Sequence, residues 1–359
     1  VTHKAKVFIN GKEVTEHKGG FLPFEVEINH FINYDKENRL TVVVNNILEW
    51  DCLPPGFIKT YNDPMHPEGY KTQEYQFDFF NYSGIHRPVI LYCTPRTYIE
   101  DIKVNTDIQD TMGIIEYSVN LCGQECEKKN IIVKVFDKED YVVAECFGQD
   151  GIIKIPNVKL WEPSNPYLYR MQVESYFDDE VEDVYNLPVG IRTIKVSGNK
   201  LLLNDKPIYL KGFGKHEDAD IRGKGFDYAI AIKDFNLMKW IGANSFRTSH
   251  YPYAEEILNL ADEEGILVID EAPAVGMNFF NYNEKVFDEK RVNDKTLEHH
   301  IEVINDLIKR DKNHPCVIMW SVANEAATYE DKAFDYFKKV VEEVKKIDKT
   351  RPITIVESS

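Results

Sequence analysis

From about Val189 to its end, the chain alternates apolar, strand-like runs with amphipathic helical segments. The runs that predict strands are residues 208–212, 244–250, 265–271, 316–320 and 352–357. Between the third and fourth runs, Leu297, Ile301, Ile304 and Ile308 form one apolar stripe at helical spacing. The run at 316–320 is apolar throughout, which is typical of a parallel strand covered by helices on both faces. The alternation restricts this half of the chain to an α/β fold, either a (β/α)8 barrel or a doubly wound sheet.

Polar residues lie at the ends of these strands, where parallel α/β folds place their functional groups. They are His216, Glu217, Asp218 and Asp220 after the first strand, Arg247 and His250 at the second, Asp270 and Glu271 at the third, and Asn324 and Glu325 after the fourth. Solvated loop charges would explain the first group, but they explain Arg247 and His250 poorly, because these two are confined between a strand and Pro252. We therefore expect a polar pocket at this edge. Taken alone, Asn324 and Glu325 have a less favoured alternative, a pair that caps a helix.

Two carboxylates and an amide in one pocket suit glycoside hydrolysis, in which paired acids flank the bond that breaks. The rival is metal-dependent hydrolysis, with His216, Glu217, Asp218 and His250 as ligands. No HExxH motif or equivalent ligand spacing supports it. We therefore predict neither a metal nor another cofactor.

The first 190 or so residues predict strands rather than helices. Asn10-Gly11 marks a hairpin turn, residues 40–44 and 89–92 predict further strands, and a long loop-rich stretch runs from Leu53 to Tyr70. Residues 96–190 contain short strands at near-regular spacing, the rhythm of a small antiparallel sandwich. Asp78 stands among aromatic residues, where it is either a ligand for sugar hydroxyls or a structural aspartate; local sequence favours the structural role.

Composition excludes several partners. The net charge of −17 argues against nucleic acid and anionic membrane surfaces, which recruit basic patches. No apolar run reaches membrane-spanning length. We interpret the six cysteines as free thiols in a reducing compartment, because Cys122 and Cys126 lack the second pair that a zinc site requires.

Two long motifs resemble the signatures of glycoside hydrolase family 2. One is Asn244-x-Phe-Arg247-Thr-Ser-His250-Tyr-Pro252, and the other runs from Asp311 to Glu325, DKNHPCVIMWSVANE. The segments 214–227 and 78–87 are similar to β-glucuronidases within that family. The resemblance covers essentially the whole chain. It implies a multidomain β and α/β protein: a partial jelly-roll sugar-binding domain (1–95), an immunoglobulin-like β-sandwich (96–192) and a partial TIM barrel with about five of eight strands (193–359).

The resemblance also implies roles for individual residues. Glu325 would be the acid/base of a retaining enzyme that releases β-D-glucuronate, a role favoured by a partly buried position beside a second carboxylate. Asn324 would bind the sugar 2-hydroxyl, Asp78 and His250 would bind the sugar, and Arg247 and His216 would support the pocket. Asp78 thereby becomes an expected ligand. The resemblance further implies a cytoplasmic bacterial enzyme, a small-molecule glycoside substrate and a homotetramer.

One departure from the family pattern concerns the second carboxylate, the nucleophile. The family carries it on a later barrel strand, in a motif that this sequence lacks. We therefore expect an internal piece of a larger protein, inactive alone, whose fifth barrel strand exposes an unpaired edge. The alternatives are another glycosidase of the family, such as a β-galactosidase, and a non-catalytic carbohydrate-binding fragment.

Overall fold

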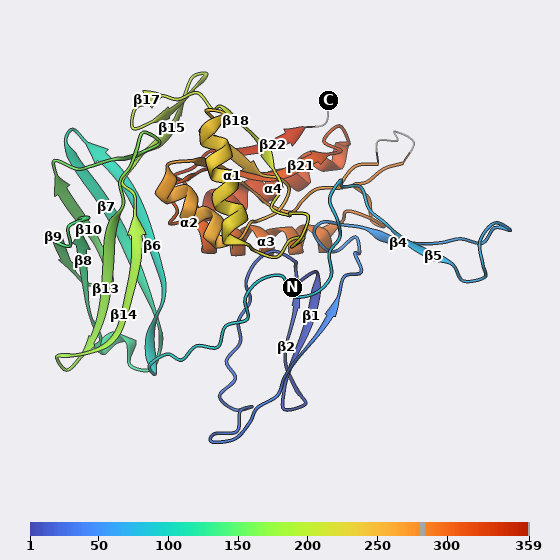
Figure 1. Ribbon diagram of the computed structural model, residues 1–359, viewed down its shortest axis with the longest axis horizontal. Helices are drawn as coiled ribbons and strands as arrows, with labels where there is room; N and C mark the ends of the chain where they lie inside the picture. The colour runs from blue at the N-terminus through green and yellow to red at the C-terminus, as the bar shows by residue number, and fades with distance from the viewer. Residues whose placement is uncertain (280–283, 358–359) are drawn as a thin grey trace.

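The computed structural model describes residues 1–279 and 284–357, which form three parts (Figure 1). The first is a small antiparallel sheet of β1 (Lys4–Ile9), β2 (Lys12–Lys18) and β3 (Leu40–Asn45), in the order β2-β1-β3. Asn10 and Gly11 both have positive φ, 53° and 84°, as a two-residue hairpin turn requires. The predicted hairpin is therefore confirmed, with Ile9 paired to Lys12.

A projecting hairpin interrupts the stretch predicted to be a long loop. β4 (Phe57–Thr60) pairs antiparallel with β5 (Lys71–Glu74), and the pair extends away from the body of the molecule (Figure 1). Beyond these strands, the His66 ring lies 4.3 Å from that of Tyr61 and 4.9 Å from that of Tyr70, centroid to centroid. The prediction missed this hairpin because its two strands have only four residues each and show no apolar alternation.

The strand predicted at residues 89–92 is wrong. This segment has no strand pairing, and its four large side chains are between 59% and 79% exposed. An apolar, β-branched run shows only that a segment would fit a sheet, whereas a strand also needs a hydrogen-bonding neighbour.

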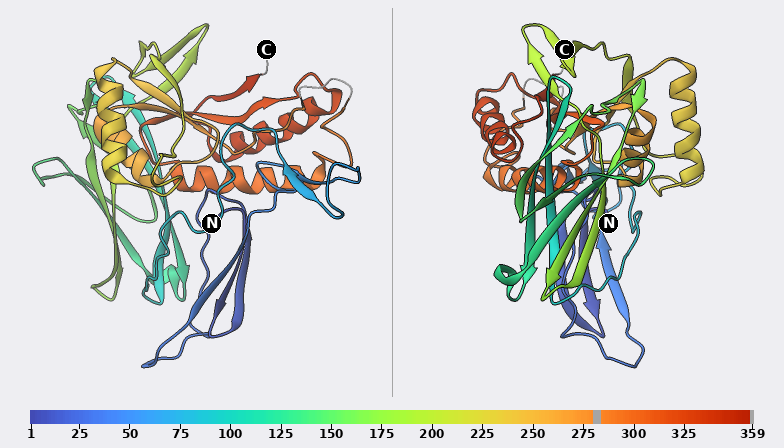
Figure 2. Two further views of the ribbon diagram at one scale, coloured as in Figure 1. Left: turned by 45° about the vertical axis from the view of Figure 1, so that its right-hand side comes forward. Right: turned by 90° about the vertical axis from the view of Figure 1, so that its left-hand side faces the viewer.

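The second part is a sandwich of two antiparallel sheets, shown from two sides in Figure 2. One sheet contains β6 (Thr97–Gln109), β7 (Met112–Gly123) and β10 (Asp150–Pro156); the other contains β8 (Asn130–Phe136), β9 (Val142–Phe147), β13 (Tyr169–Phe177) and β14 (Glu180–Val189). Alternate residues of both sheets, such as Ile115 and Val133, are buried in one shared core. The short elements η1 (Cys126–Lys128), β11 (Trp161–Glu162) and β12 (Asn165–Pro166) complete this part.

The third part is a five-stranded parallel sheet with helices between successive strands. A small antiparallel sheet, made of successive hairpins of β15 (Ile194–Ser197), β16 (Lys200–Leu203) and β17 (Lys206–Pro207), leads into it. The elements then run β18 (Gly212–Lys215), α1 (Tyr228–Trp240), β19 (Ser245–Thr248), α2 (Glu255–Glu264), β20 (Leu267–Glu271), α3 (Asp294–Asp311), β21 (Val317–Ala326), α4 (Asp331–Ile347) and β22 (Ile353–Glu357). The strands lie side by side in chain order, with β18 and β22 at the two edges.

The first strand of this sheet lies later than predicted. Residues 208–211 form no strand, because the Ile208 N–H bonds the Leu201 carbonyl of the preceding hairpin and the Lys211 N–H bonds the Asn244 side chain. The apolar side chains of this segment do pack against the core. The apolar pattern therefore marked the packed side chains Ile208 and Leu210, but it placed the strand a few residues too early.

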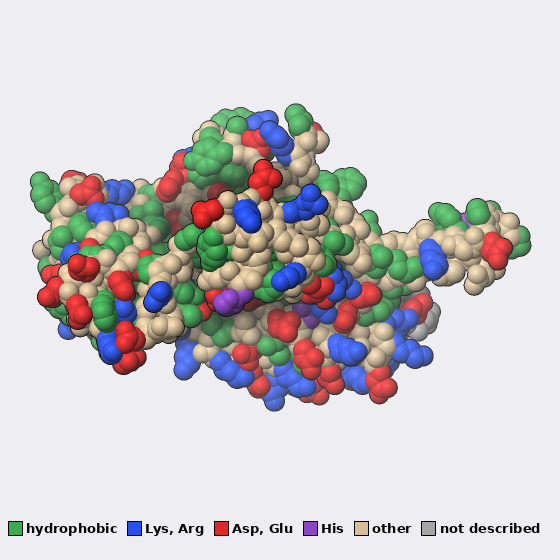
Figure 3. All heavy atoms as spheres, turned by 90° about the horizontal axis from the view of Figure 1, so that it is seen from below, with side chains coloured by type: hydrophobic (Ala, Val, Ile, Leu, Met, Phe, Trp, Pro, Cys, Tyr) green, Lys and Arg blue, Asp and Glu red, His purple; other side chains and the backbone are tan. Residues whose placement is uncertain are grey.

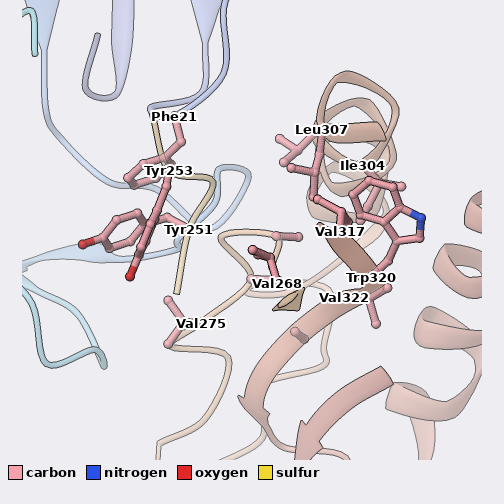
Figure 4. Packing of buried hydrophobic residues seen from close by; sticks show 14 of the residues in the cluster. Phe21, Tyr251, Tyr253, Val268, Val275, Ile304, Leu307, Val317, Trp320 and Val322 are labelled. Atoms are coloured by element: carbon pink, nitrogen blue, oxygen red, sulfur yellow. The ribbon is translucent and has the colours of Figure 1, made fainter. Parts of the chain in front are cut away.

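Packing between a helix and the sheet holds β21, the strand that ends at Asn324 and Glu325. In Figure 4, Val317 and Trp320 of β21 lie beside Ile304 and Leu307 of α3. Trp320 is fully buried, and its indole N–H donates to Asp348 at 2.8 Å. The strand is therefore anchored along its length before it reaches the polar residues.

The turn before β21 joins the sheet to the sandwich. Asn313 accepts a hydrogen bond from the Val104 N–H and donates one to the Ile102 carbonyl, both on β6. The buried Arg192 donates to the carbonyls of Pro315 and Val317 at 3.0 and 2.7 Å. These contacts fix the start of β21 against a second rigid unit.

Acidic and basic side chains are interspersed over the face seen in Figure 3. All six cysteines are free, as predicted. No helix within the described residues is long and apolar enough to cross a membrane.

A buried carboxyl at the end of β20 makes stability depend on pH. Asp270 is fully buried and accepts a hydrogen bond from Thr248 at 3.1 Å. Burial, the charge of Asp311 and a hydrogen bond to Asp311 raise the pKa of Asp270 well above its usual value. Arg310 donates to both Asp311 oxygens at 2.7 Å.

We expect Asp270→Asn to be increasingly more stable than the wild type as pH rises above about 4. A carboxyl whose pKa is raised on folding stabilises the fold fully only below its unfolded pKa, and this stability is lost as pH rises toward the folded pKa. The asparagine amide can donate to Asp311 and does not titrate, so this contact does not change with pH. Urea unfolding at pH 5, 7 and 9 should show the difference growing by up to about 1.4 kcal/mol per pH unit.

The matched variant Asp270→Ala leaves Thr248 and Asp311 without this partner, so it should be less stable than Asp270→Asn at every pH. A difference between wild type and Asp270→Asn that stays constant with pH would show that Asp270 is ionised in the folded protein.

Candidate active site

β21 changes its course at Glu325. This residue has φ 48°, in the left-handed region, and the pairing of β21 with β22 slips between Asn324 and Ala326. Irregular pairing of this kind redirects side chains and is frequent beside functional sites. Asn324 and Ala326 are buried, whereas Glu325 is exposed. The Glu325 backbone carbonyl accepts a hydrogen bond from Asn278 at 3.2 Å.

A fully buried carboxylate, Glu271 at the end of β20, organises the polar groups beside Asn324. Arg247 donates to its two oxygens at 2.7 and 2.6 Å, Ser321 donates at 2.7 Å, and His250 Nδ1 lies 2.8 Å away. Because a carboxylate can only accept, this short contact favours a proton on His250 Nδ1. Arg247 also donates to Asn324 Oδ1 at 3.1 Å, which leaves the Asn324 NH2 group for another partner.

A second group lies next to His250. His216 Nε2 is 4.0 Å from a carboxylate oxygen of Asp78, and the His216 and His250 rings are 5.6 Å apart. Burial lowers the pKa of His216. The Asp78 side chain is 79% exposed and is therefore accessible to a ligand. Residues far apart in the chain thus meet in one polar region.

The predicted site residues therefore divide into two groups that share His250. Arg247 and His250 bond Glu271, and Arg247 also bonds Asn324; His216 lies next to His250 and close to Asp78. Glu325 follows Asn324 in the chain, but its side chain is exposed. The expectation of a partly buried Glu325 is wrong for this chain.

Sequence reasoning placed Glu271 at a strand end but did not select it as a site residue. It also missed an ion pair between Arg87 and Glu217, at 2.8 Å, which connects the N-terminal part to the sheet. Glu217 also accepts a hydrogen bond from the Ala254 N–H at 2.8 Å, at the start of α2. The only signal for Glu271 was its place after a buried strand near Arg247 and His250.

Two groups of residues within the described chain have ligand atoms close enough for a metal ion. In the buried group, the Asp262 oxygens already bond His314 and the Cys316 N–H, at 2.6 and 2.9 Å. The other group is Asp78, His216 and His250. The metal site considered as the rival would also need Glu217 and Asp218 as ligands. These two carboxylates have other partners, because Glu217 is paired with Arg87 and Asp218 accepts a hydrogen bond from Tyr82.

Three parts of glycosyl hydrolases family 2 match the chain in succession. The sugar-binding domain matches residues 1–95, the family's central region matches 97–192, and the TIM barrel domain matches 194–359. Together these matches cover the N-terminal sheet and projecting hairpin, the sandwich, and the parallel sheet described above.

Several β-glucuronidases are similar to the chain. The enzyme of Paenibacillus borealis is 54% identical over 358 residues, and that of Rattus norvegicus is 46% identical over 363; each alignment covers 99% of this chain. Among solved structures, the β-D-glucuronidase of Dictyoglomus thermophilum superposes with a TM-score of 0.96 at 58% identity, covering the whole chain. A Ruminococcus gnavus β-glucuronidase in complex with a C6-substituted uronic isofagomine gives 0.88 at 41% identity, covering 98%.

The chain spans only part of these relatives. It covers 59% of the Paenibacillus protein, 54% of the rat protein, and 61% and 58% of the two solved chains. The family matches nevertheless follow one another along the chain in the order of its three parts. The chain belongs to glycosyl hydrolases family 2.

Proposed function

We propose that the complete protein is a retaining β-glucuronidase and that this chain supplies the acid/base side of its active site. The observation that supports this most is a bonded chain of polar groups: Arg247 and His250 bond the buried Glu271, and Arg247 also bonds Asn324, the residue before Glu325 in the sequence. The similarity to β-glucuronidases over 99% of the chain supports the choice of sugar.

Glu325 is the proposed general acid/base. It protonates the glycosidic oxygen as the bond breaks, then takes a proton from the water that releases the sugar. Its exposed side chain can reach a ligand, and the left-handed backbone turns it away from the buried face of β21. Asn324 is proposed to donate its free NH2 group to the sugar 2-hydroxyl, a contact that strengthens in the transition state.

The sugar-binding residues are proposed to be Asp78 and His250. The Asp78 carboxylate accepts hydrogen bonds from sugar hydroxyls, and His250 Nε2 accepts another, because Glu271 favours the proton on Nδ1. Arg247 and His216 support the pocket: Arg247 orients Asn324, and His216 lies between Asp78 and His250.

A double displacement needs a second carboxylate about 5 Å from the first. We propose that sequence beyond this chain supplies it, together with the rest of a barrel of which β18–β22 are five strands. The domain limits would be 1–95, 96–192 and 193–359. We further propose a homotetramer, and a cytoplasmic location in keeping with the six free cysteines.

The deciding experiment compares p-nitrophenyl β-D-glucuronide with the β-D-galactoside, using the complete protein. We expect kcat/KM to favour the glucuronide by about 10³-fold or more, because a site built for a polar group rejects a substrate that lacks it. Preference for the galactoside would instead indicate another glycosidase of the family. Binding of glucuronate without hydrolysis of either substrate would indicate a carbohydrate-binding protein.

A further inference from the structure

The ammonium of Lys224 lies inside the molecule between three aromatic rings. Its Nζ is 3.6 Å from the ring centroid of Tyr251, 4.3 Å from that of Phe21 and 5.0 Å from that of Phe79. Lys224 is 3% exposed. Phe21 stacks on Tyr251 at 4.9 Å, and Figure 4 shows these two rings close together. We call Phe21, Phe79, Tyr251 and Lys224 the aromatic cage.

The ring faces compensate part of this buried charge. Across residues 1–279 and 284–357, no ion pair includes Lys224. The charges of Glu217 and Asp218 act on Lys224, but both carboxylates have other partners: Glu217 pairs with Arg87, and Asp218 accepts a hydrogen bond from Tyr82. The faces of aromatic rings attract cations, most strongly where water is excluded. Burial lowers the pKa of Lys224 to about 7, so the charge is retained at mildly acidic pH.

A tight loop carries Lys224 into the cage. Ala219 and Gly223 exchange backbone hydrogen bonds of 2.9 and 2.8 Å. Gly223 has φ 54°, and the Tyr82 ring lies only 2.8 Å from where a Cβ would stand, so a larger residue would not fit. The loop backbone, and not only the side chain, therefore fixes the position of Lys224.

The caged rings are neighbours of the proposed sugar ligands. Phe79 directly follows Asp78, and Tyr251 directly follows His250. The Tyr251 hydroxyl also lies 3.4 Å from His216 Nδ1 and accepts a hydrogen bond from the Glu217 N–H at 3.3 Å. Movement of these rings would therefore displace Asp78, His216 and His250 together.

We propose that Lys224 is a positioning residue that holds Asp78, His216 and His250 in register by drawing Phe21, Phe79 and Tyr251 around its ammonium. This role rests on the proposed function, because it presumes that Asp78 and His250 bind the sugar. Lys224 itself does not touch the substrate. It connects the N-terminal part, which carries Phe21 and Asp78, to the sheet that carries His250.

The test uses Lys224→Met in the complete protein, because methionine has a similar length and no charge. We expect KM for the β-glucuronide to rise about 10-fold or more with kcat changed less than about 3-fold, since ligand binding rather than chemistry is disturbed. Lys224→Arg, which keeps the charge, should recover most of the loss. Lys200→Met, in the exposed hairpin β15–β16, is the matched control and should leave both constants unchanged. An unchanged KM in folded Lys224→Met would overturn the proposal.

Measuring KM over a range of pH distinguishes positioning by the charge of Lys224 from packing by its side chain alone. The charged or titratable groups that face Lys224 are Arg87, Glu217, Asp218, His3, His86 and His216. The three histidines have lowered pKa values and are neutral above pH 7. Lys224 is charged below pH 7 and loses its charge above it, so KM should rise from pH 6 to pH 8.5 in the wild type and stay level in Lys224→Arg. Equal rises in both would overturn the proposal.

Near-ultraviolet circular dichroism tests the cage without activity. If the complete wild-type protein cleaves no glycoside, the proposed function fails, and the cage is judged by this spectrum alone. Lys224→Met should change the spectrum in the tyrosine region, and Lys224→Arg should restore it. Identical spectra for the wild type and Lys224→Met would show that the ammonium does not organise the rings. If Lys224→Met does not fold, the wild-type spectra at pH 6 and pH 8.5 are compared instead. Identical spectra at the two pH values would show that the ammonium does not organise the rings.

Discussion

Replacing Glu325 by Gln in the complete protein is expected to lower kcat on an alkyl β-D-glucuronide by about 10³-fold or more. The amide keeps the shape of the side chain but can neither protonate the leaving oxygen nor take a proton from water. A poor leaving group depends on the acid, so its turnover should suffer most. Initial rates with an alkyl and a nitrophenyl glucuronide measure the difference.

The role of Glu325 can be separated from a loss of structure. Glu263→Gln, on the exposed face of α2, is the matched control and should keep wild-type rates. Azide needs no general base, so it should restore turnover of the nitrophenyl substrate by Glu325→Gln. Normal turnover of the alkyl glucuronide by this variant would remove Glu325 from the acid/base role.

Glu271→Ala is expected to lower the free energy of unfolding by about 3 kcal/mol, near the lower end for breaking a buried ion pair. The side chain of Glu271 is fully buried and accepts hydrogen bonds from Arg247, His250 and Ser321. Its loss would leave the Arg247 charge without a counter-charge. The Arg247 side chain is 21% exposed, so water offsets part of the cost. Urea unfolding of the chain measures the change.

The control is Glu264→Ala, which removes an ion pair with Lys239 between two partly exposed side chains. Pairs of this kind contribute about 0–1 kcal/mol, so the variant should remain close to the wild type. Equal losses of unfolding free energy in the two variants would mean that Glu271 stabilises the fold no more than an exposed ion pair does. In the complete protein, Glu271→Ala should also abolish activity, because Arg247 no longer orients Asn324.

Local patterns predicted the elements whose cause is local. The turn at Asn10-Gly11 follows from the φ values that these two residues tolerate, and α3 follows from one apolar stripe. The five parallel strands were found for the same reason, although the first was placed too early. The predicted strand at 89–92 failed because pairing requires a neighbour that no local pattern can supply.

The sequence alone was sufficient for the family and for the residues that end its strands, because the two signature motifs and the strand–helix alternation are both local. Only the tertiary structure showed that Arg247 and His250 bond Glu271 while Arg247 also holds Asn324, and that Lys224 stands among rings from separate segments. It also showed that Glu325 is exposed. The physical reason is that burial and electrostatic contact depend on residues brought together from distant positions in the chain. Neither the spacing of residues nor the composition determines which distant residues come into contact.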